Sequence, residues 1–582
     1  PQTLPAMPLH LYRSNHTETL LNHLVANLTK APPTDPFAEI PIAVGSRGME
    51  RWLRHQIATQ RGIAARFAFP FPQPAFDGAV AALLDQHDPS LPFWAREQSE
   101  SVWSTERLPW HVALAVRALL VDPDPAIASA MTRVHHYLHR GGDATHELVG
   151  EAQTRTPTAI TARELSFAAE VAHAIDDVVR HRPDLAYEWR QWAALFGKQG
   201  AKMHVPPSFA ANERWLALVT SRVDQLMVDQ LAPQGAALAA NKIVVDPAAR
   251  RQQLERGAGT ASGRSLGTLH VFGLSTLQAE ELKTLALIAR SKRLHVHLYL
   301  LAPSCEWLRD LHSKGERRVE LQRAAARTAE TGVDTLTDLL IQFEDYNRLL
   351  ADCGRPSRDV QALLEGSADY IEPLERSSEL SGEAPGLFVD SLAQAQRDGE
   401  PLTALKTLQH DLLYANAAPP ADRREPLPLD DSSVQFHPCH GPLRQVELLR
   451  DQLLSAFAAD ATLQPRDVLV MTPDIATYAP LVGAVFAHKS VGASRPGRDG
   501  STVTQLPPIP VSIADLGLRS TNPVADVLLS VLELATERVN LAAILSLLQL
   551  APLRERFGLQ ADDFGDLQRM LMESGVRWWP KT

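Results

Sequence analysis

The chain has few cysteines, no long apolar run and no leader-like start. Its 582 residues include only Cys305, Cys353 and Cys439, far apart, which argues against a disulfide framework and favours a reducing compartment. No apolar run reaches the ~18 residues of a membrane-spanning helix. Residues 1–12 lack the basic stretch and apolar core of a signal peptide. The sequence therefore predicts a cytoplasmic protein without a membrane role.

An excess of positive charge is also missing. Lys and Arg number 57 against 68 Asp and Glu, so the net charge is -11. This balance argues against a protein that coats nucleic acid by charge alone. It still allows a local basic lining under an acidic exterior, because binding depends on the local field. The composition, 45% hydrophobic and 21% charged, is typical of a globular protein, and the length allows several domains.

Hydrophobic periodicity predicts an α/β fold that is interrupted by helices. The chain opens with an alternation of strands and amphipathic helices, which is the pattern of a parallel sheet. Long helical tracts follow, and two further β-α-β units come after them. The predicted strands are residues 9–12, 40–44, 269–272, 294–301, 434–437 and 467–471, and the predicted helices are 18–28, 49–57, 278–289, 442–457 and several within 85–240 and 522–578.

The first strand-to-helix turn lacks the residues that hold a nucleotide. A phosphate-binding loop needs glycines for close backbone approach, a lysine for the phosphates and Ser or Thr for Mg²⁺. The turn here is Arg13, Ser14, Asn15, His16 and Thr17, with neither glycine nor lysine. We therefore predict an inactive nucleotide site and no cofactor for this chain. Residues 492–499 have suitable glycine spacing, but Arg and Asp replace the lysine and the hydroxyl residue.

No metal or catalytic constellation can be assigned. His135 and His139 have helical i, i+4 spacing but no nearby carboxylate in a zinc-protease pattern, and a solvated helix face explains them better. His295 and His297 are interpreted as a structural pair on one strand face. No nucleophile elbow or pair of catalytic carboxylates is present, so no catalytic residue is predicted.

Residues 45–77 combine cations with aromatic rings, as a single-strand channel requires. This segment contains five arginines against two acidic residues, Glu50 and Asp77. Of its aromatic residues, Trp52, Phe67 and Phe69 are best explained as core residues. Phe71 and Phe76, near prolines in an expected loop, are the better candidates for stacking on bases. The predicted DNA contacts in this segment are Ser46, Arg47, Arg51, Arg54, Arg66, Phe71 and Phe76.

An ordered set of segments resembles RecC, the gamma subunit of exodeoxyribonuclease V. Residues 9–15 (LHLYRSN) resemble the family's opening, and residues 44–53 (VGSRGMERWL) resemble a segment shortly after it. The block with the most matches is residues 429–447 (LDDSSVQFHPCHGPLRQVE). Further matches are residues 62–72, 182–189, 272–275, 466–475 and 573–578. The matches run from residue 9 to 578, and family members are considerably longer.

The resemblance implies a superfamily 1 helicase-like fold with large helical insertions and an inactive nucleotide site. On this pattern, residues 1–85 begin helicase domain 1A, and residues 263–350 return to it after a helical insertion. Residues 431–520 would form domain 2A and residues 521–582 the start of domain 2B. The remaining parts are 86–262, the insertion resembling domain 1B, and 351–430, a broken helical region or linker.

The resemblance also implies a function and partners. A RecC-like chain is a non-catalytic subunit of an ATP-dependent helicase and exonuclease that repairs double-strand breaks by homologous recombination. RecB and RecD, which use ATP and Mg²⁺, would be its partners. It would split duplex DNA ends, channel the single strands and scan one of them for the Chi sequence.

The family's Chi-reading pocket can be carried over by position. It falls at Gly45, Phe71, Asp77, His173, Ala174 and Asp176, and the resemblance also adds Asp176 and Arg182 to the predicted DNA contacts. Only Asp176 keeps the expected residue type; the other five replace an expected Gln, Leu, Trp, Asp and Leu. Loss of the Gln removes a bidentate base contact, and loss of the Trp removes a stacking face. The resemblance therefore predicts a chain that reads another sequence, or none.

Two other interpretations remain open. An AddB-type subunit has a similar layout, but some members bind ATP and carry an iron–sulfur nuclease, which the turn at Arg13–Thr17 and the scattered cysteines disfavour. A helical scaffold without a DNA role would fit the long helical tracts, but it leaves the ordered matches and the arginine–aromatic segment unexplained.

Overall fold

The structure is a computed structural model that divides into two compact units, Pro1–Val434 and Gln435–Thr582. It describes residues 9–30, 39–84, 103–139, 160–195, 213–231, 247–256, 265–308, 311–331, 347–366, 387–419, 430–486, 509–536 and 541–574, apart from 104–105, 275, 292, 307, 515 and 561–562, together with the isolated residues 37, 92, 94 and 422.

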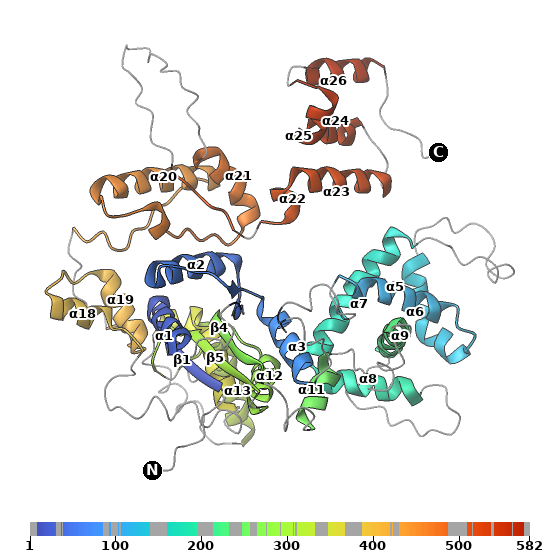
Figure 1. The fold of residues 1–582 in the computed structure, drawn as a ribbon, viewed down its shortest axis with the longest axis horizontal. Helices are drawn as coiled ribbons and strands as arrows, with labels where there is room; N and C mark the ends of the chain where they lie inside the picture. Colours follow the sequence, from blue (N-terminus) through green and yellow to red (C-terminus); the bar gives the residue numbers. More distant parts are fainter. Residues whose placement is uncertain are drawn as a thin grey trace. The chain divides into compact units, whose positions relative to one another are not determined.

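A five-stranded parallel sheet forms the centre of the first unit (Figure 1). Its strands are β1 (Leu9–Ser14), β2 (Ile40–Val44), β3 (Phe67–Ala68), β4 (Gly267–Leu274) and β5 (Leu294–Leu301). The spatial order is β1-β5-β4-β2-β3, and every neighbouring pair is parallel. Parallel neighbours need long crossovers, usually through helices. The predicted α/β class and the strands expected between residues 9 and 301 are confirmed.

Helices cover both faces of this sheet because its strands alternate two sets of apolar side chains. On one face, Val271 and Leu298 pack with α3 (Pro72–Leu83) and α12 (Ala279–Arg290). On the other face, Phe272 and Tyr299 pack with α1 (Thr17–Lys30) and α2 (Arg47–Arg61). The sheet is therefore the middle layer of three.

A helical cluster with its own core lies between β3 and β4 in the sequence (Figure 1). Trp189, Ile175 and Val112 belong to this core. Its helices are α5 (Leu108–Leu120), α6 (Pro125–His139), α7 (Ala162–His181), α8 (Pro183–Leu195) and α9 (Arg214–Leu231). The helix α11 (Pro247–Glu255) contacts α7 and α8 as well as α3 and α12, so it joins the cluster to the sheet.

The rest of the first unit is helical. After β5 come α13 (Lys314–Thr331), α15 (Arg348–Cys353), α16 (Arg355–Gly366), α18 (Ser391–Asp398) and α19 (Ala404–Leu413). Val360 and Leu364 of α16 pack into the core on the α12 side of the sheet. Helix α16 therefore adds to the helical layer on the α12 side of the sheet.

The second unit contains α20 (Pro442–Ala459), η4 (Pro465–Asp467), α21 (Ile475–Phe486), α22 (Leu518–Thr521), α23 (Pro523–Thr536), α24 (Leu541–Gln549), α25 (Ala551–Phe557) and α26 (Asp563–Glu573). The helix predicted over 442–457 is confirmed. The strands predicted at 434–437 and 467–471 are wrong, since both segments lack any strand. Phe436 is 89% exposed and Leu469 83% exposed. Apolar content alone does not make a strand, because a strand also needs a neighbour for its backbone hydrogen bonds.

Cys305, Cys353 and Cys439 are free thiols, as the sequence predicts. Within the described parts of the chain, no helix is long and apolar enough to cross a membrane.

Candidate nucleic-acid interface

Three arginines of α2 form a basic stripe on the side of the helix away from the core. Arg47, Arg51 and Arg54 follow i, i+4, i+7 spacing and are exposed. Leu53 and Ile57 on the opposite side are fully buried under the sheet. The helix thus anchors itself by apolar side chains and presents cations outward. Below, the "α2 stripe" means Arg47, Arg51 and Arg54.

Ser46 starts α2 and fixes its N-terminus. Its side chain accepts a hydrogen bond from the Met49 backbone N–H at 3.2 Å. Such an N-cap satisfies a donor that the first helical turn leaves unpaired. The hydroxyl of Ser46, predicted to contact DNA, therefore has a structural role in holding the α2 stripe.

Aromatic rings lie beside the stripe, as the sequence predicts. The Arg47 guanidinium lies 5.0 Å from the centre of the Phe71 ring, and that of Arg54 lies 4.8 Å from the Phe69 ring. Phe71 is 38% exposed, whereas Phe69 is buried in the core. The structure thus brings one accessible ring, Phe71, next to the stripe.

Glu50 lies between Arg47 and Arg54 and partly neutralises their charge. It pairs with Arg47 at 2.6 Å and with Arg54 at 3.2 Å. Partial burial raises the pKa of Glu50, but the hydrogen bonds and charges of the two arginines outweigh it and leave the pKa below its usual value. Glu50 is therefore ionised at neutral pH, and the helix segment keeps a net positive charge.

Phe76, predicted to stack on bases from a loop, is instead buried within a helix. The prolines nearby predict a loop, but Pro72 stands in the first turn of α3, where proline is tolerated. Phe76 lies inside this helix, is 1% exposed and packs in the core with Leu285 and Ile288. Its ring cannot stack on a base without unfolding α3.

Two other predicted contacts lie on the surface. Arg66 is exposed, and its backbone has a positive φ of 64°, an uncommon conformation for a side chain with a Cβ. Its carbonyl accepts from the Ile40 N–H at 2.9 Å, which begins the pairing of β2 with β3. Arg182 is exposed and paired with Asp184 at 2.9 Å. Exposed pairs of this type contribute little to stability.

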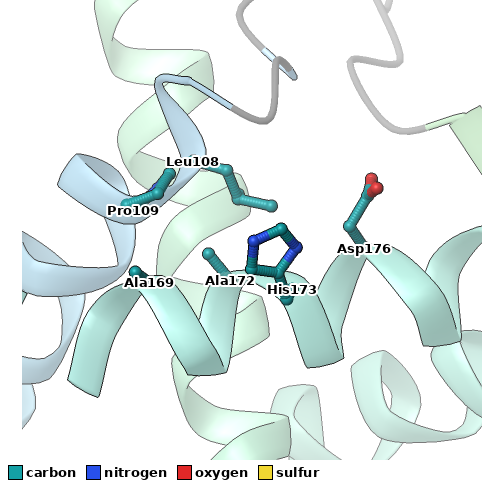
Figure 2. Close-up of a pocket in the computed structure, with 6 residues that line it drawn as sticks. All are labelled: Leu108, Pro109, Ala169, Ala172, His173 and Asp176. Atoms are coloured by element: carbon teal, nitrogen blue, oxygen red, sulfur yellow. The ribbon is translucent and has the colours of Figure 1, made fainter. Parts of the chain in front are cut away.

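Helix α7 carries three of the positions assigned to Chi reading by resemblance. His173 and Asp176 line a small hollow with Leu108 and Pro109 of α5, and Figure 2 shows both side chains on the same side of α7. Ala174 is exposed on the same helix, and Gly45 is exposed at the end of β2. The polar side chains that α7 contributes to this hollow are those of His173 and Asp176, and Ala169 and Ala172 of the same helix also line it.

The carboxylates of Asp77 and Asp176 are held by a single arginine. Arg180 of α7 donates from Nε to both oxygens of Asp176 at 2.9 Å and also pairs with Asp77 of α3. Trp103 donates from Nε1 to Asp176 at 2.9 Å, and Gln73 donates to Asp77 at 3.2 Å. Below, the "Asp–Arg–Asp triad" means Asp77, Arg180 and Asp176.

The Asp–Arg–Asp triad is largely buried. All three side chains are about nine-tenths covered. Burial lowers the pKa of Arg180, but the charges and hydrogen bonds of Asp77 and Asp176 raise it above its ordinary value. Sequence reasoning missed Arg180 and Trp103, and only the i, i+4 spacing of Asp176 and Arg180 could have indicated one of these contacts.

The strand-end turn predicted to be a degenerate nucleotide site is occupied by the chain itself. Asn15 exchanges two hydrogen bonds with the backbone of Val389, both at 2.8 Å. Ser14 is fully buried and donates to the Leu387 carbonyl at 2.5 Å. The Arg13 guanidinium lies 5.9 Å from the centre of the Phe388 ring. His16 donates its backbone N–H to Ser14 Oγ, and α1 begins at Thr17.

Among the described residues, no group of three or more His, Cys, Asp or Glu side chains could hold a metal ion. His297 stacks between His10 and His270, at ring distances of 4.7 and 5.0 Å, within the sheet. Of the predicted structural pair, His297 is packed in this stack, whereas His295 is exposed. The glycine-spaced segment 492–499 lies outside the described residues.

These features define an α/β protein with a three-layer parallel-sheet unit, an inserted helical cluster and an exposed arginine stripe. The chain matches the family "RecC, N-terminal domain" over residues 9–415 and "RecBCD enzyme subunit RecC fourth domain" over residues 521–578. It belongs to the RecC N-terminal domain family.

Relatives named "RecBCD enzyme subunit RecC" align with almost the whole chain. That of Mycobacterium tuberculosis (strain ATCC 25618 / H37Rv) is 30% identical over 593 residues, 98% of this chain and 43% of the relative. That of Mycolicibacterium smegmatis is 28% identical over 574 residues, with the same coverages. That of Escherichia coli (strain K12) is 26% identical over 604 residues, 98% of this chain and 45% of the relative. The chain thus spans less than half the length of these relatives.

Proposed function

We propose that this chain is the DNA-binding, non-catalytic part of a RecC subunit, which works with RecB and RecD in double-strand break repair. In this role it helps to split duplex ends and guides single strands, while the partner subunits use ATP and Mg²⁺. The observation that carries the proposal is the α2 stripe with the exposed ring of Phe71. Cations that track a backbone, combined with a ring that stacks on any base, suit sequence-independent single-strand binding.

The non-catalytic part of the proposal is supported by the strand-end turn. A superfamily 1 helicase-like fold would bind ATP at the turn between its first strand and helix, through glycines and a lysine. Here Arg13–Thr17 contains neither glycine nor lysine. The side chains of Ser14 and Asn15 donate hydrogen bonds to the carbonyls of Leu387 and Val389. Turnover of ATP is therefore assigned to the partners.

Chi reading is proposed to differ from that of the family. Asp176 could accept hydrogen bonds from a base, but its two oxygens are already bonded to Arg180 and Trp103. Asp77, where the family has a stacking Trp, is bonded to the same arginine. Carboxylates bound in this way serve structure instead of readout. A single-strand crosslinking panel of octamers tests this, and normal preference for the usual Chi would contradict it.

The central experiment measures binding of a forked DNA end and of ATP by the purified chain, alone and with RecB and RecD. Fork binding without ATP binding is expected. ATP binding or turnover by the pure chain would make it a motor and refute the inactive site. Absence of fork binding, even with both partners, would favour the helical scaffold interpretation. The family match favours RecC over an AddB-type subunit.

A further inference from the structure

The segment that occupies the strand-end turn is the start of a helical pair. Asp390 directly follows Val389 and caps α18, accepting from the backbone N–H groups of Leu392 and Ala393 at 3.1 and 3.0 Å. The same carboxylate bonds to Nδ1 of His410 in α19 at 3.0 Å. One residue thus links the docked segment to both helices. Below, the "α18–α19 module" means residues 387–416.

The far end of this module is bound at the end of β5. The Leu413 carbonyl accepts from Ser304 Oγ at 2.8 Å and from the Cys305 N–H at 3.1 Å. Asn347 donates from Nδ2 to the carbonyls of Asp411 and Asn416, at 3.2 and 2.9 Å. Ser304 is fully buried and Asn347 is 7% exposed, so these bonds are shielded from water and from its competition.

β1 and β5 are parallel neighbours, so their carboxyl ends lie at the same end of the sheet. Ser14 and Asn15 bind the first residues of the module there, and Ser304 and Asn347 bind its last residues. The last residues of the first unit are hydrogen-bonded to α19, the second helix of the module. The α19 backbone donates from Ala404 to Asp431 at 2.6 Å and from Leu405 to Ser433 Oγ at 3.1 Å.

We propose that the turn Ser14–His16 is a peptide-binding site whose ligand is residues 387–389 of the same chain. In the place where a nucleotide-binding fold holds phosphates, this fold holds a backbone segment. Through this segment, the α18–α19 module is fixed to the carboxyl end of the sheet. Since Asp431 and Ser433 bind the module, the docked segment also fixes the point where the chain leaves the first unit.

Asn15 is suited to this ligand for a chemical reason. An amide side chain has a donor and an acceptor side by side, so it can pair with the C=O and N–H of one residue as a neighbouring strand would. A carboxylate cannot donate, so Asn15→Asp keeps the size but loses the bond to the Val389 carbonyl. The inference does not depend on DNA binding, because every contact is within this chain.

Hydrogen–deuterium exchange of the whole chain tests the proposal. In Asn15→Asp, we expect the amides of residues 389–393 to exchange at least tenfold faster than in the unchanged chain. The matched control is Asn22→Asp, on the outer face of α1, where Asn22 is exposed and accepts from Gln60. Protection of β4 and β5 in both variants verifies that the sheet is intact.

A second variant guards against misfolding of the turn itself. Val389→Pro removes the N–H that Asn15 accepts, without changing the sheet, and is expected to accelerate the same amides. Unchanged exchange at residues 390–393 in both variants would overturn the proposal. So would faster exchange there on adding MgATP to the unchanged chain, because nucleotide would then compete for the turn. Neither result bears on fork binding, which is measured separately.

Discussion

Asp77 of α3 and Arg180 of α7 form an ion pair that joins the sheet to the helical cluster. Asp176 shares the same guanidinium, so one cation compensates two carboxylates. Removal of the cation leaves two buried negative charges next to each other. We expect Arg180→Met to lower the free energy of unfolding by about 3–5 kcal/mol, as for other buried pairs with one partner deleted. Urea denaturation at neutral pH measures this.

The control for this variant is Arg182→Met, two residues further along. Arg182 is exposed and paired with an equally exposed Asp184, so no measurable loss of stability is expected. Equal stability of the Arg180 and Arg182 variants would mean that the Asp–Arg–Asp triad contributes nothing to the fold.

The stability of the first unit should fall with acid because of the stacked histidines. Burial and the neighbouring histidines lower the pKa of His270 to about 3 and that of His297 to about 4. Both folded values lie below the ordinary value of 6.5, so the neutral form is favoured by folding. The contribution to stability is complete above about pH 6.5 and is lost as the pH falls to about 4 for His297 and to about 3 for His270.

Urea unfolding at pH 8, 6.5 and 5 tests this dependence. In His297→Gln, stability should change less between pH 8 and pH 5 than in the unchanged chain, because the variant lacks one of the two histidines that take up a proton on unfolding. The control is His55→Gln, on the exposed side of α2. A pH dependence that is the same in all three proteins would rule out the histidine stack as its cause.

The α2 stripe should contribute to DNA binding through phosphates. We expect the triple change Arg47, Arg51 and Arg54→Gln to weaken binding of single-stranded DNA at all sequences equally. The slope of log K against log salt should decrease by about 2, because each phosphate contact on a single strand contributes about 0.7. Fluorescence anisotropy over a salt series measures it. Lys283→Gln with Arg355→Gln, two exposed cations elsewhere, should leave the slope unchanged.

Phe71 and Phe76 are five residues apart but should behave in opposite ways. Phe71→Ala is expected to weaken single-strand binding by about 1–3 kcal/mol through loss of a stacked base, with little effect on unfolding. Phe76→Ala is expected to lower the free energy of unfolding by about 3–5 kcal/mol, because it opens a cavity in the core. Anisotropy and urea denaturation of both variants separate the two roles. Loss of stability without loss of binding in Phe71→Ala would place that ring in the core.

The parallel sheet could be predicted because its strands are continuous apolar runs separated by amphipathic helices. The same signal failed at residues 434–437 and 467–471, since periodicity reports the content of a segment and not whether a neighbour pairs with it. The basic and aromatic residue types around α2 could also be read from the sequence. Accessibility could not, because Pro72 is compatible with both a loop and the first turn of a helix.

The contacts that define the strand-end turn and the histidine stack were beyond sequence reasoning. Asn15 and Val389 are 374 positions apart. His10, His297 and His270 meet only because β1, β5 and β4 are neighbours in this register. The Asp–Arg–Asp triad likewise joins α3 to α7 over 103 positions. Long-range pairing depends on topology, which a single sequence without aligned relatives does not specify.

The strand order has a consequence for synthesis of the chain. In the described sheet β1 pairs only with β5, and Tyr12 and His297 are 285 positions apart. At roughly 5–20 residues per second, the ribosome needs about 15–60 s to supply that partner. During this interval the backbone N–H and C=O groups at the edge of β1 lack their strand partner, while the local contacts of α5–α9 can already form. Nascent chains that stall before residue 294 should therefore be the species that chaperones hold.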